Sequence, residues 1–384
     1  MSAAYPYAPI QMHDSWLAVD PVVGCKASCA YCLLHLAGWT GVRPEVVRGT
    51  DEIVADLLGH RYFTPHTTHL AFGTRTDVLL PEVTPHALRF LTALDQRGLR
   101  NSVALISKLE VNAETAAALS RLQNVRVVFL ASWSALGRGV EKGVPRGAAV
   151  RTLHRLRDYG VPSIHYFRPL LPSNTADEVL RHVLATVAGV AGSTVHVGIK
   201  LNPRLRPHYA AHPALKPAAE VDDEYGTWVP DDAVERLRRI AAREFPDHPL
   251  YEHTSCAVSH ALGEADYTAT RHRSDVCHPS HCPTAQRARC AGLPAPRPDD
   301  AVAAVRKLGL ANDVAVQDGV VHISGVLGQE DYCHLLHTIG SPIDGEVDYF
   351  RVFRGGIFEP GHRARNDRGS CNGTPAAHSG QEPG

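Results

Sequence analysis

Three cysteines within eight residues constrain this chain more than any other feature. Residues 24–32 read Gly-Cys-Lys-Ala-Ser-Cys-Ala-Tyr-Cys, so Cys25, Cys29 and Cys32 are separated by three and then two residues. A loop this tight can turn all three sulfurs onto one inorganic centre, and thiolates are the usual protein ligands of iron–sulfur clusters. The sequence has no fourth cysteine nearby. A four-iron cluster held here would therefore keep one iron open for a substrate or a cofactor.

The cysteine loop follows directly on a predicted strand. Residues 16–23 form an apolar run that is typical of a buried strand, and the first cysteine comes just after it. In barrels of alternating strands and helices, active sites lie at the carboxyl ends of the strands. Two other interpretations of the thiols are a zinc knuckle and three unrelated cysteines. Structural zinc takes four ligands, often in two short pairs, and only one short pair is present.

Composition limits the partners and the compartment. The chain has 39 Lys and Arg residues against 40 Asp and Glu residues, so no global field draws it to nucleic acid, although a local basic face remains open. No apolar run is long enough to span a bilayer, and residues 1–13 do not read as a signal peptide. We expect a cytoplasmic protein with no membrane partner. Nine cysteines in that reduced compartment favour metal or redox chemistry over disulfides.

Apolar patterns predict strands that alternate with helices. The expected strands are residues 16–23, 68–74, 102–108, 125–132, 163–167, 195–200 and 249–256. The expected helices between them include residues 44–59, 85–97, 112–122, 177–190 and 230–245, with one more carrying Arg151. Such alternation predicts an α/β fold built from parallel, right-handed βα units.

The cysteine spacing, with Tyr31 directly before the last thiol, resembles the signature of the radical S-adenosylmethionine (radical SAM) enzymes. The resemblance implies a partial (β/α)6 TIM-like barrel over residues 16–262 and a [4Fe-4S] cluster whose open iron binds S-adenosylmethionine. It further implies that an electron from the cluster cleaves this cofactor to a 5′-deoxyadenosyl radical, which abstracts hydrogen from a substrate. A reductant such as flavodoxin or ferredoxin would then be a partner.

Further motifs resemble the spore photoproduct lyase branch of that family. They are Glu141-x-Gly-x-Pro, a helix with Arg151, Gly160-Val-Pro and Pro169-x-x-Pro. In that branch a Ser/Thr-Lys after the third strand contacts the methionine carboxylate, which implies this role for Lys108. Glu141 and Arg151 would orient the ribose and carboxylate of the cofactor, and a loop-to-helix ion pair is the alternative for both.

Three other strand ends are candidates to hold the cofactor. Gly73 and Thr74 fall where the family's small-residue segment binds the methionine amino group, but the common Gly-Gly-Glu form is missing and a plain turn is the alternative. Ser132 ends the fourth strand with a hydroxyl. Gly198 in the sixth strand would let the adenine approach the backbone.

A second group of thiols supplies another full ligand set, namely Cys256, Cys277, Cys282 and Cys290. One interpretation is an auxiliary four-iron cluster that conducts electrons or anchors a substrate. The other is a structural zinc site, either all-cysteine or mixed with His278 and His281. Cys256 is also a candidate hydrogen-atom donor to a substrate radical.

The remaining chain divides by composition. We expect an irregular lead-in over residues 1–15, a Cys-rich auxiliary metal segment over 263–295, a small α+β unit over 296–354 and a disordered polar tail over 355–384. The α+β unit contains helices at 299–308 and 329–339, a hairpin at 314–324 and a strand at 348–353. It would cap the barrel, grip a partner or simply pack against it.

Two classes of function remain open. The first is a radical SAM enzyme whose unidentified substrate is a small molecule, a peptide or a nucleic acid. The second is a non-catalytic zinc-binding module that organises a nucleic-acid-binding surface. A local concentration of basic residues bears on the nucleic-acid interpretations: Arg138, Lys142, Arg146, Arg151, Arg155 and Arg157. A helix face rich in arginine is also compatible with plain solvation.

Overall fold

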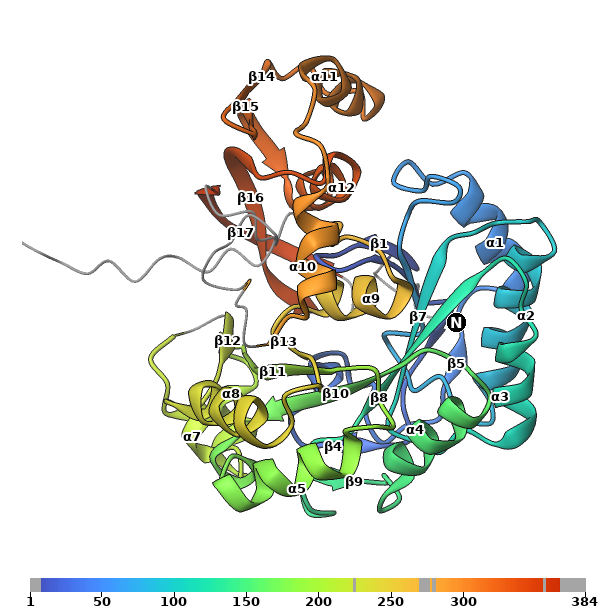
Figure 1. The fold of residues 1–384 in the computed structure, drawn as a ribbon, viewed down its shortest axis with the longest axis vertical. Helices are drawn as coiled ribbons and strands as arrows, with labels where there is room; N and C mark the ends of the chain where they lie inside the picture. The colour runs from blue at the N-terminus through green and yellow to red at the C-terminus, as the bar shows by residue number, and fades with distance from the viewer. Residues whose placement is uncertain (1–7, 224–225, 269–276, 278–280, 355–356, 367–384) are drawn as a thin grey trace, which may run out of the picture.

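The computed structural model describes residues 8–223, 226–268, 277, 281–354 and 357–366. Figure 1 shows an α/β domain built on one large sheet, with a smaller C-terminal sheet above it. None of the helices in these ranges is long and apolar enough to cross a membrane.

The large sheet has the strand order β1-β2-β6-β7-β8-β10-β11-β12, and β13 also pairs with β11. Its strands are β1 (Ile10–Met12), β2 (Leu17–Val19), β6 (Leu70–Phe72), β7 (Ser102–Ser107), β8 (Arg126–Ser132), β10 (Ser163–Leu170), β11 (Thr194–Leu201), β12 (Gly226–Trp228) and β13 (Leu250–Tyr251). All neighbours from β2 to β11, and β13 on β11, are parallel, whereas β1 and β12 are antiparallel edge strands. The two edges do not pair with each other in the described chain, so the sheet is open.

Alternate side chains along each strand of the large sheet point to its two faces, and both faces are buried. Phe72, Leu105 and Phe129 pack with the helices that connect the strands. Their neighbours Ala71, Ala104 and others pack instead with helix α9 (Thr254–Leu262). Successive side chains of a strand point to opposite faces, so each strand contributes to both cores. Burial on both faces explains why these strands read as continuous apolar runs in the sequence.

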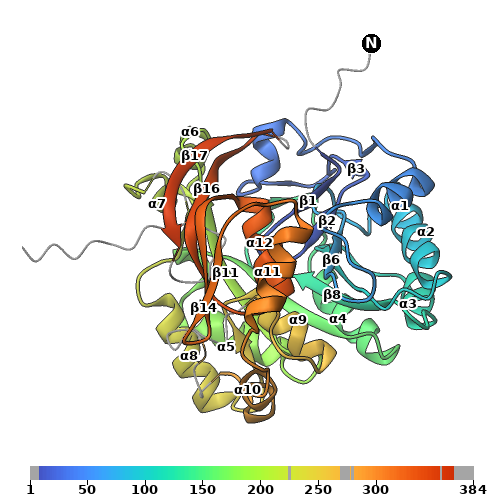
Figure 2. The ribbon, with the colours of Figure 1, turned by 90° about the horizontal axis from the view of Figure 1, so that it is seen from above.

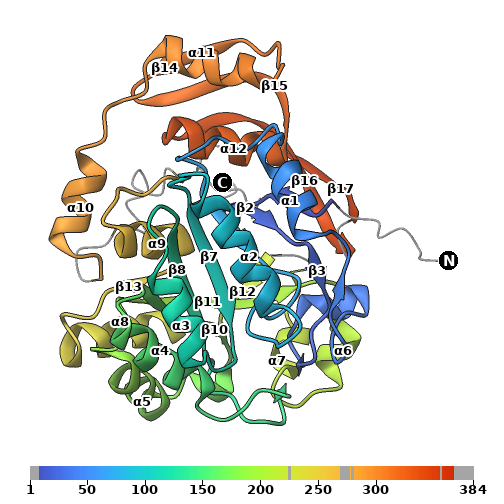
Figure 3. The same cartoon turned by 90° about the vertical axis from the view of Figure 1, so that its right-hand side faces the viewer.

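The connecting helices are α1 (Thr50–Leu58), α2 (Thr84–Asp95), α3 (Ala113–Ser120), α4 (Ala148–Asp158), α5 (Asp177–Val187) and α8 (Ala233–Glu244). Figure 3 shows α2, α3 and α4 in front of strands β7 and β8. Helix α1 begins six residues later than the pattern predicts. Residues Glu45–Val46 form strand β5, which pairs with β3 (Val22–Val23). Glu52 then accepts a hydrogen bond from the Gly49 N–H, which fixes the helix start at Thr50.

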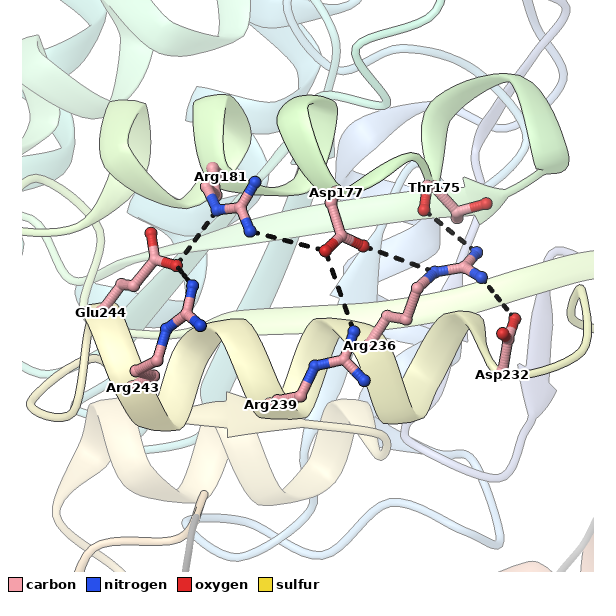
Figure 4. A network of polar contacts seen from close by, with 8 residues as sticks. All are labelled: Thr175, Asp177, Arg181, Asp232, Arg236, Arg239, Arg243 and Glu244. Carbon is pink, nitrogen blue, oxygen red and sulfur yellow. Dashed lines mark hydrogen bonds and ion pairs between the residues drawn. The ribbon is translucent and has the colours of Figure 1, made fainter.

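Helices α5 and α8 are joined by the network of arginines and carboxylates in Figure 4. Asp177, at the first position of α5, is the central acceptor and faces Arg181, Arg236 and Arg239. The Nε atom of Arg181 also lies 3.1 Å from Glu244 Oε1 at the end of α8. These contacts hold two outer helices together, and their exposed positions make each contribution small.

The structure corrects the prediction of a strand over residues 249–256. The strand β13 ends at Tyr251, and Cys256 is the third residue of helix α9 rather than the end of a strand. A short apolar run cannot be assigned to strand or helix by periodicity alone. Here Thr254, Ala257 and Val258 are buried on one side of a helix that packs against the sheet.

The C-terminal unit is larger than predicted. It contains α11 (Pro298–Lys307), β14 (Val314–Gln317), β15 (Val320–Gly328), α12 (Gln329–Ile339), β16 (Ile343–Arg354) and β17 (Ile357–Asn366). The first part of the expected disordered tail is thus a strand, because β17 pairs antiparallel with β16. An edge strand offers backbone groups that a polar segment can pair without burying apolar side chains. Residues 367–384 lie outside the described chain.

The C-terminal unit packs on the first strands of the large sheet, as Figure 2 shows for α12 beside β1. The Glu330 carboxylate accepts a 2.9 Å hydrogen bond from the Met12 N–H, and His337 Nε2 lies 2.7 Å from the Asp14 carbonyl oxygen. Tyr62 donates to Asp331 at 2.9 Å. The two parts also share one apolar core. The unit is therefore built into the domain.

The remaining short helices are η1 (Leu33–Ala37), η2 (Pro172–Asn174), α6 (Arg206–Ala210), α7 (Lys216–Ala219) and α10 (Thr284–Ala291), and the remaining short strands are β4 (Ser28–Cys29) and β9 (Glu141–Lys142). Most of them bear on the sites described next. Helix α10 carries Cys290, whereas β4, β9 and η1 shape the first cysteine loop.

Candidate functional site

The cysteine loop leaves the sheet after β2 and β3 and is fixed by its own backbone. Gly24 adopts φ +92°, which only glycine tolerates easily, and its carbonyl accepts a 2.6 Å hydrogen bond from Thr76 Oγ1. The Cys25 N–H donates to the Trp39 carbonyl at 2.8 Å, and the Cys25 carbonyl accepts from Val42 at 3.0 Å. The first thiol is thus held by bonds on both sides.

The other two cysteines are placed by short-range pairing. Cys29 lies in β4, opposite Glu141 of β9 in an antiparallel pair. The Cys32 N–H donates to the Cys29 carbonyl at 3.0 Å, and Cys32 then caps the 3-10 helix η1. His35 reaches back from η1 to the same carbonyl at 3.0 Å. The loop therefore turns back on itself between the second and third thiol.

The three thiols share one buried, electrostatically coupled environment. Burial and the nearby Asp77 carboxylate raise the pKa of Cys25 to about 12, and the Cys32 thiolate adds to this increase. Burial also raises the pKa of Cys29 to about 12, with contributions from Glu141, Cys32 and Cys25, while Lys108 opposes them. The effects of Cys25 and Cys32 on the pKa of Cys29 indicate that the three thiols lie near one another. Ionising them together requires a strongly positive centre between them.

A buried ion pair lies directly beside the thiols. Lys108 Nζ lies 2.8 Å from Glu141 Oε1 and donates a 2.9 Å hydrogen bond to Ser132 Oγ. Tyr31 donates its hydroxyl hydrogen bond to the same Glu141 oxygen. An ammonium group has three N–H donors, and two of them are used here. Lys108 is therefore positioned by its partners and keeps one N–H for a ligand.

Asp77 ties the ends of two strands together. Its carboxylate accepts hydrogen bonds from Ser107 Oγ at 2.5 Å and from the Lys108 N–H at 2.9 Å. Burial nevertheless raises the pKa of Asp77 above its ordinary value. Because the Lys108 backbone is fixed by Asp77 while its side chain is fixed by Glu141, the ammonium position is set from both ends.

Gly73 and Thr74 form the turn after β6. Gly73 adopts φ +75°, and a Cβ there would come within 2.7 Å of Val78 Cγ1, so the turn requires glycine. Thr74 Oγ1 donates a 2.8 Å hydrogen bond to Asp20, and the Arg75 guanidinium lies 3.6 Å from the same carboxylate. These contacts fix the conformation of the turn that Gly73 and Thr74 form.

The structure does not bring Arg151 and Gly198 to the thiols in the expected way. Arg151 Nε lies 2.5 Å from Glu110 Oε2, in an exposed pair between a loop and helix α4, and not beside Glu141. The space in front of Gly198 is filled, since a Cβ there would lie 2.0 Å from the Trp228 carbonyl oxygen. Close strand packing explains this glycine, where the sequence suggested access for adenine.

Two cations near the thiols are missing from the sequence-based prediction. Arg168 of β10 stabilises the Cys32 thiolate electrostatically, and its Nη1 donates a 3.0 Å hydrogen bond to the Tyr166 hydroxyl. Lys200 of β11 lies near Arg168, which with burial lowers the pKa of Lys200 to about 8. The available signal was a basic residue near the carboxyl end of each of two consecutive predicted strands. Extending the predicted strand of residues 163–167 by one residue would have placed Arg168 at its carboxyl end.

The second cysteine group also converges. Burial raises the pKa of Cys256, and the Asp266 carboxylate and the other three thiols add to the increase. Cys290 Sγ accepts hydrogen bonds from the Asp266 N–H at 3.3 Å and from Gln286 Nε2 at 3.6 Å. A small cavity borders three of the four thiols and is lined by His196, Arg238, Leu250, Tyr251, Glu252, Cys256, Cys277, His281 and Cys282. Of the predicted histidine alternatives, His278 lies outside the described residues.

Over the described ranges, no three His, Cys, Asp or Glu side chains are grouped closely enough to hold one metal ion.

Comparison with known proteins gives distant structural neighbours. No protein-family model and no curated protein matches the chain. A spore photoproduct lyase complexed with dinucleoside spore photoproduct is similar over 65% of this chain and 80% of its own, with TM-score 0.49 and 14% identity. SuiB of Streptococcus suis, solved with S-adenosylmethionine, has TM-score 0.40 and 11% identity over 60% of this chain and 50% of its own.

A third neighbour is TsrM of Kitasatospora setae, a radical S-adenosylmethionine methyltransferase, with TM-score 0.38 and 16% identity over 50% of this chain and 39% of its own. At such identities and TM-scores these neighbours carry no inference about activity, which has to come from the site.

Proposed function

We propose that this protein is a radical SAM enzyme, with Cys25, Cys29 and Cys32 as the ligands of its catalytic [4Fe-4S] cluster. The observation that carries the proposal is the placement of three neighbouring thiols in the loop after β2, with Cys29 paired to Glu141 and beside the Lys108–Glu141 ion pair. When bound, the cluster would supply the electron that cleaves S-adenosylmethionine to a 5′-deoxyadenosyl radical, which takes hydrogen from the substrate. The open parallel sheet would then be the partial (β/α)6 TIM-like barrel of that family.

The neighbouring side chains would bind and orient the cofactor. Lys108 offers its remaining N–H to the methionine carboxylate, while Glu141 and Ser132 hold the ammonium in place. Glu141 also accepts from Tyr31, which connects the cofactor side of the site to the cysteine loop. Burial of this network excludes water, which strengthens each of its electrostatic contacts.

We propose a cytoplasmic enzyme that takes electrons from a reductant such as flavodoxin or ferredoxin. The nucleic-acid alternative, with zinc at both cysteine groups, is less well supported. Three of the basic residues on which it relies already have acidic partners, since Arg151 and Arg155 pair with Glu110, and Arg157 pairs with Asp158.

For Cys256, Cys277, Cys282 and Cys290 we propose an auxiliary [4Fe-4S] cluster, with zinc as the alternative. The effect of the other three thiols on the pKa of Cys256, and the cavity that borders three of the four, support one shared inorganic centre. The role of Cys256 as a hydrogen donor is weakened, because its thiol is surrounded by the other three and by Asp266. Its environment is that of a ligand.

Metal analysis after anaerobic reconstitution tests both assignments. We expect about eight irons per chain, falling to about four when Cys25, Cys29 and Cys32 are all replaced by alanine. The single variant Cys29→Ala should release no 5′-deoxyadenosine from S-adenosylmethionine in the presence of dithionite. Cys333→Ala is the matched control, because Cys333 is a fully buried thiol in the apolar core of the C-terminal unit. Colourless protein that contains only zinc would refute the enzyme proposal.

A further inference from the structure

We propose that Arg168 and Lys200 form a binding site for an oxyanion group of the substrate, a carboxylate or a phosphate. This inference rests on the proposed function and deepens it, because it assigns the substrate a negative charge. The two residues lie on neighbouring parallel strands, β10 and β11, which Figure 1 shows side by side. Each is within two residues of the carboxyl end of its strand. Ligands of parallel sheets bind at these ends.

The positive charges of the two residues are close together. Arg168 is the neighbouring charge with the largest effect on Lys200, and it opposes protonation of the Lys200 amine. Asp14 acts on Lys200 in the opposite sense and more weakly. Arg168 also acts on the Cys32 thiolate. Arg168 therefore lies within electrostatic reach of a proposed cluster ligand, where a substrate must be placed for hydrogen abstraction.

Within the described chain, neither cation forms an ion pair with a carboxylate. Arg168 bonds to the neutral hydroxyl of Tyr166 and stacks over its ring at 5.0 Å, and its guanidinium meets no carboxylate among the described side chains. The Lys200 ammonium has no hydrogen-bond or ion-pair partner in the same part of the chain. The hydrogen bond from the Tyr209 hydroxyl goes to the Lys200 backbone carbonyl. Two partly buried like charges without an acid are costly to the fold.

Other cations nearby do have acid partners, which makes this pair exceptional. Lys108 pairs with Glu141 at 2.8 Å, and Arg75 lies 3.6 Å from Asp20. An anion bound between Arg168 and Lys200 would complete the same pattern. The planar guanidinium suits two-point contact with an oxyanion, and the ammonium adds a point charge.

The test uses the full-length, anaerobically reconstituted protein and calorimetric titration with sulfate, whose charge is constant between pH 7 and pH 9. Wild-type protein should bind sulfate, and Lys200→Met should weaken that binding at least tenfold. Lys216→Met is the control that should bind as wild type does, because Lys216 is 65% exposed and lies 3.8 Å from Glu220. Titration with acetate then shows whether the site prefers a carboxylate or a tetrahedral oxyanion.

Proton uptake gives a readout that a structural role would not produce. The free Lys200 amine has a pKa of about 8. Sulfate binding should therefore take up more proton at pH 9 than at pH 7, because more of the free amine is neutral at pH 9. Titration in two buffers of different ionisation enthalpy measures this uptake. The pH dependence should vanish in Lys200→Met.

The outcomes separate this inference from the proposed function. If wild-type protein releases 5′-deoxyadenosine but takes up no proton with sulfate, the anion site is wrong and the enzyme proposal stands. If sulfate binds as predicted but no iron is incorporated, the enzyme proposal fails and with it the assignment of the anion to a substrate. If Lys200→Met weakens S-adenosylmethionine binding as much as sulfate binding, the pair serves the cofactor and the inference is overturned.

Discussion

Replacing Glu141 by glutamine should leave the Lys108 ammonium buried without a counter-charge. The two side chains are 8% and 16% exposed, so water compensates little for the lost carboxylate. Breaking a buried pair from one side costs about 3–5 kcal/mol, and the amide oxygen of glutamine still accepts hydrogen bonds. We therefore expect Glu141→Gln to lower the free energy of unfolding by about 3 kcal/mol, the lower end of that range.

The expected change in melting temperature follows from the chain length. Unfolding entropy of about 2.1 cal/mol/K per residue gives about 0.8 kcal/mol/K for a chain of this length, so 3 kcal/mol corresponds to about 4 °C. Differential scanning fluorimetry on the metal-free, reduced protein measures it. Lys216→Met is again the control, and its exposed ion pair with Glu220 predicts no measurable shift.

A double-variant cycle decides whether the effect belongs to the pair. Lys108→Met alone should also destabilise, because Glu141 is then the unpaired charge. With both substitutions no buried charge remains, so the double variant should lose about 2 kcal/mol less than the sum of the two single losses. Losses that add to within about 0.5 kcal/mol would refute the argument that Lys108 is held by Glu141.

Three further predictions concern pH and packing. The pKa of Lys200 is about 8 in the fold and about 10.5 in the unfolded chain. At pH 7 the lysine is charged in both states, and its charge destabilises the fold. This destabilisation disappears as the pH rises from about 8 to about 10.5. Lys200→Met should therefore melt higher than wild type at pH 7, and scans at increasing pH should show the gap closing; a constant gap contradicts the assignment. Burial lowers the pKa of His165 to about 3, so the free energy of unfolding should fall as the pH drops below about 6.5. His165→Gln should make this fall with pH less steep, as measured by acid unfolding followed by circular dichroism. Gly198→Ala places a Cβ 2.0 Å from the Trp228 carbonyl oxygen and should lower the melting temperature. Gly139→Ala is the control, because a Cβ there has no atom within 4 Å, and it should leave the melting temperature unchanged. Equal changes in melting temperature for the two variants would contradict the contact with Trp228.

The local sequence was sufficient to predict the elements of the large sheet. Apolar runs located β6, β7, β8, β10 and β11, because strands buried on both faces read as continuous apolar segments. The spacing of Cys25, Cys29 and Cys32 likewise pointed to one inorganic centre, since three thiols in eight residues can converge without help from distant parts of the chain. These signals are local, and so they survive in the sequence alone.

Other features depend on contacts between distant segments. Cys256 lies in a helix because α9 packs against the sheet, and the polar segment after residue 356 is a strand because β16 offers its edge. The ion pair of Arg151 with Glu110 likewise depends on the fold, which brings α4 beside the loop after β7. In each case the pattern permits two structures of similar local energy, and a tertiary contact decides between them.

The sequence by itself determined that this chain has a three-cysteine loop at the end of a buried strand in an α/β fold. Only the tertiary structure decided which side chains surround that loop. The Lys108–Glu141 pair joins residues 33 positions apart, and Arg168 approaches Lys200 only because β10 and β11 are neighbours in the sheet. The charge of a single residue can be read from a sequence, but whether a neighbour neutralises it is a property of the fold, because electrostatic interaction depends on distance and burial.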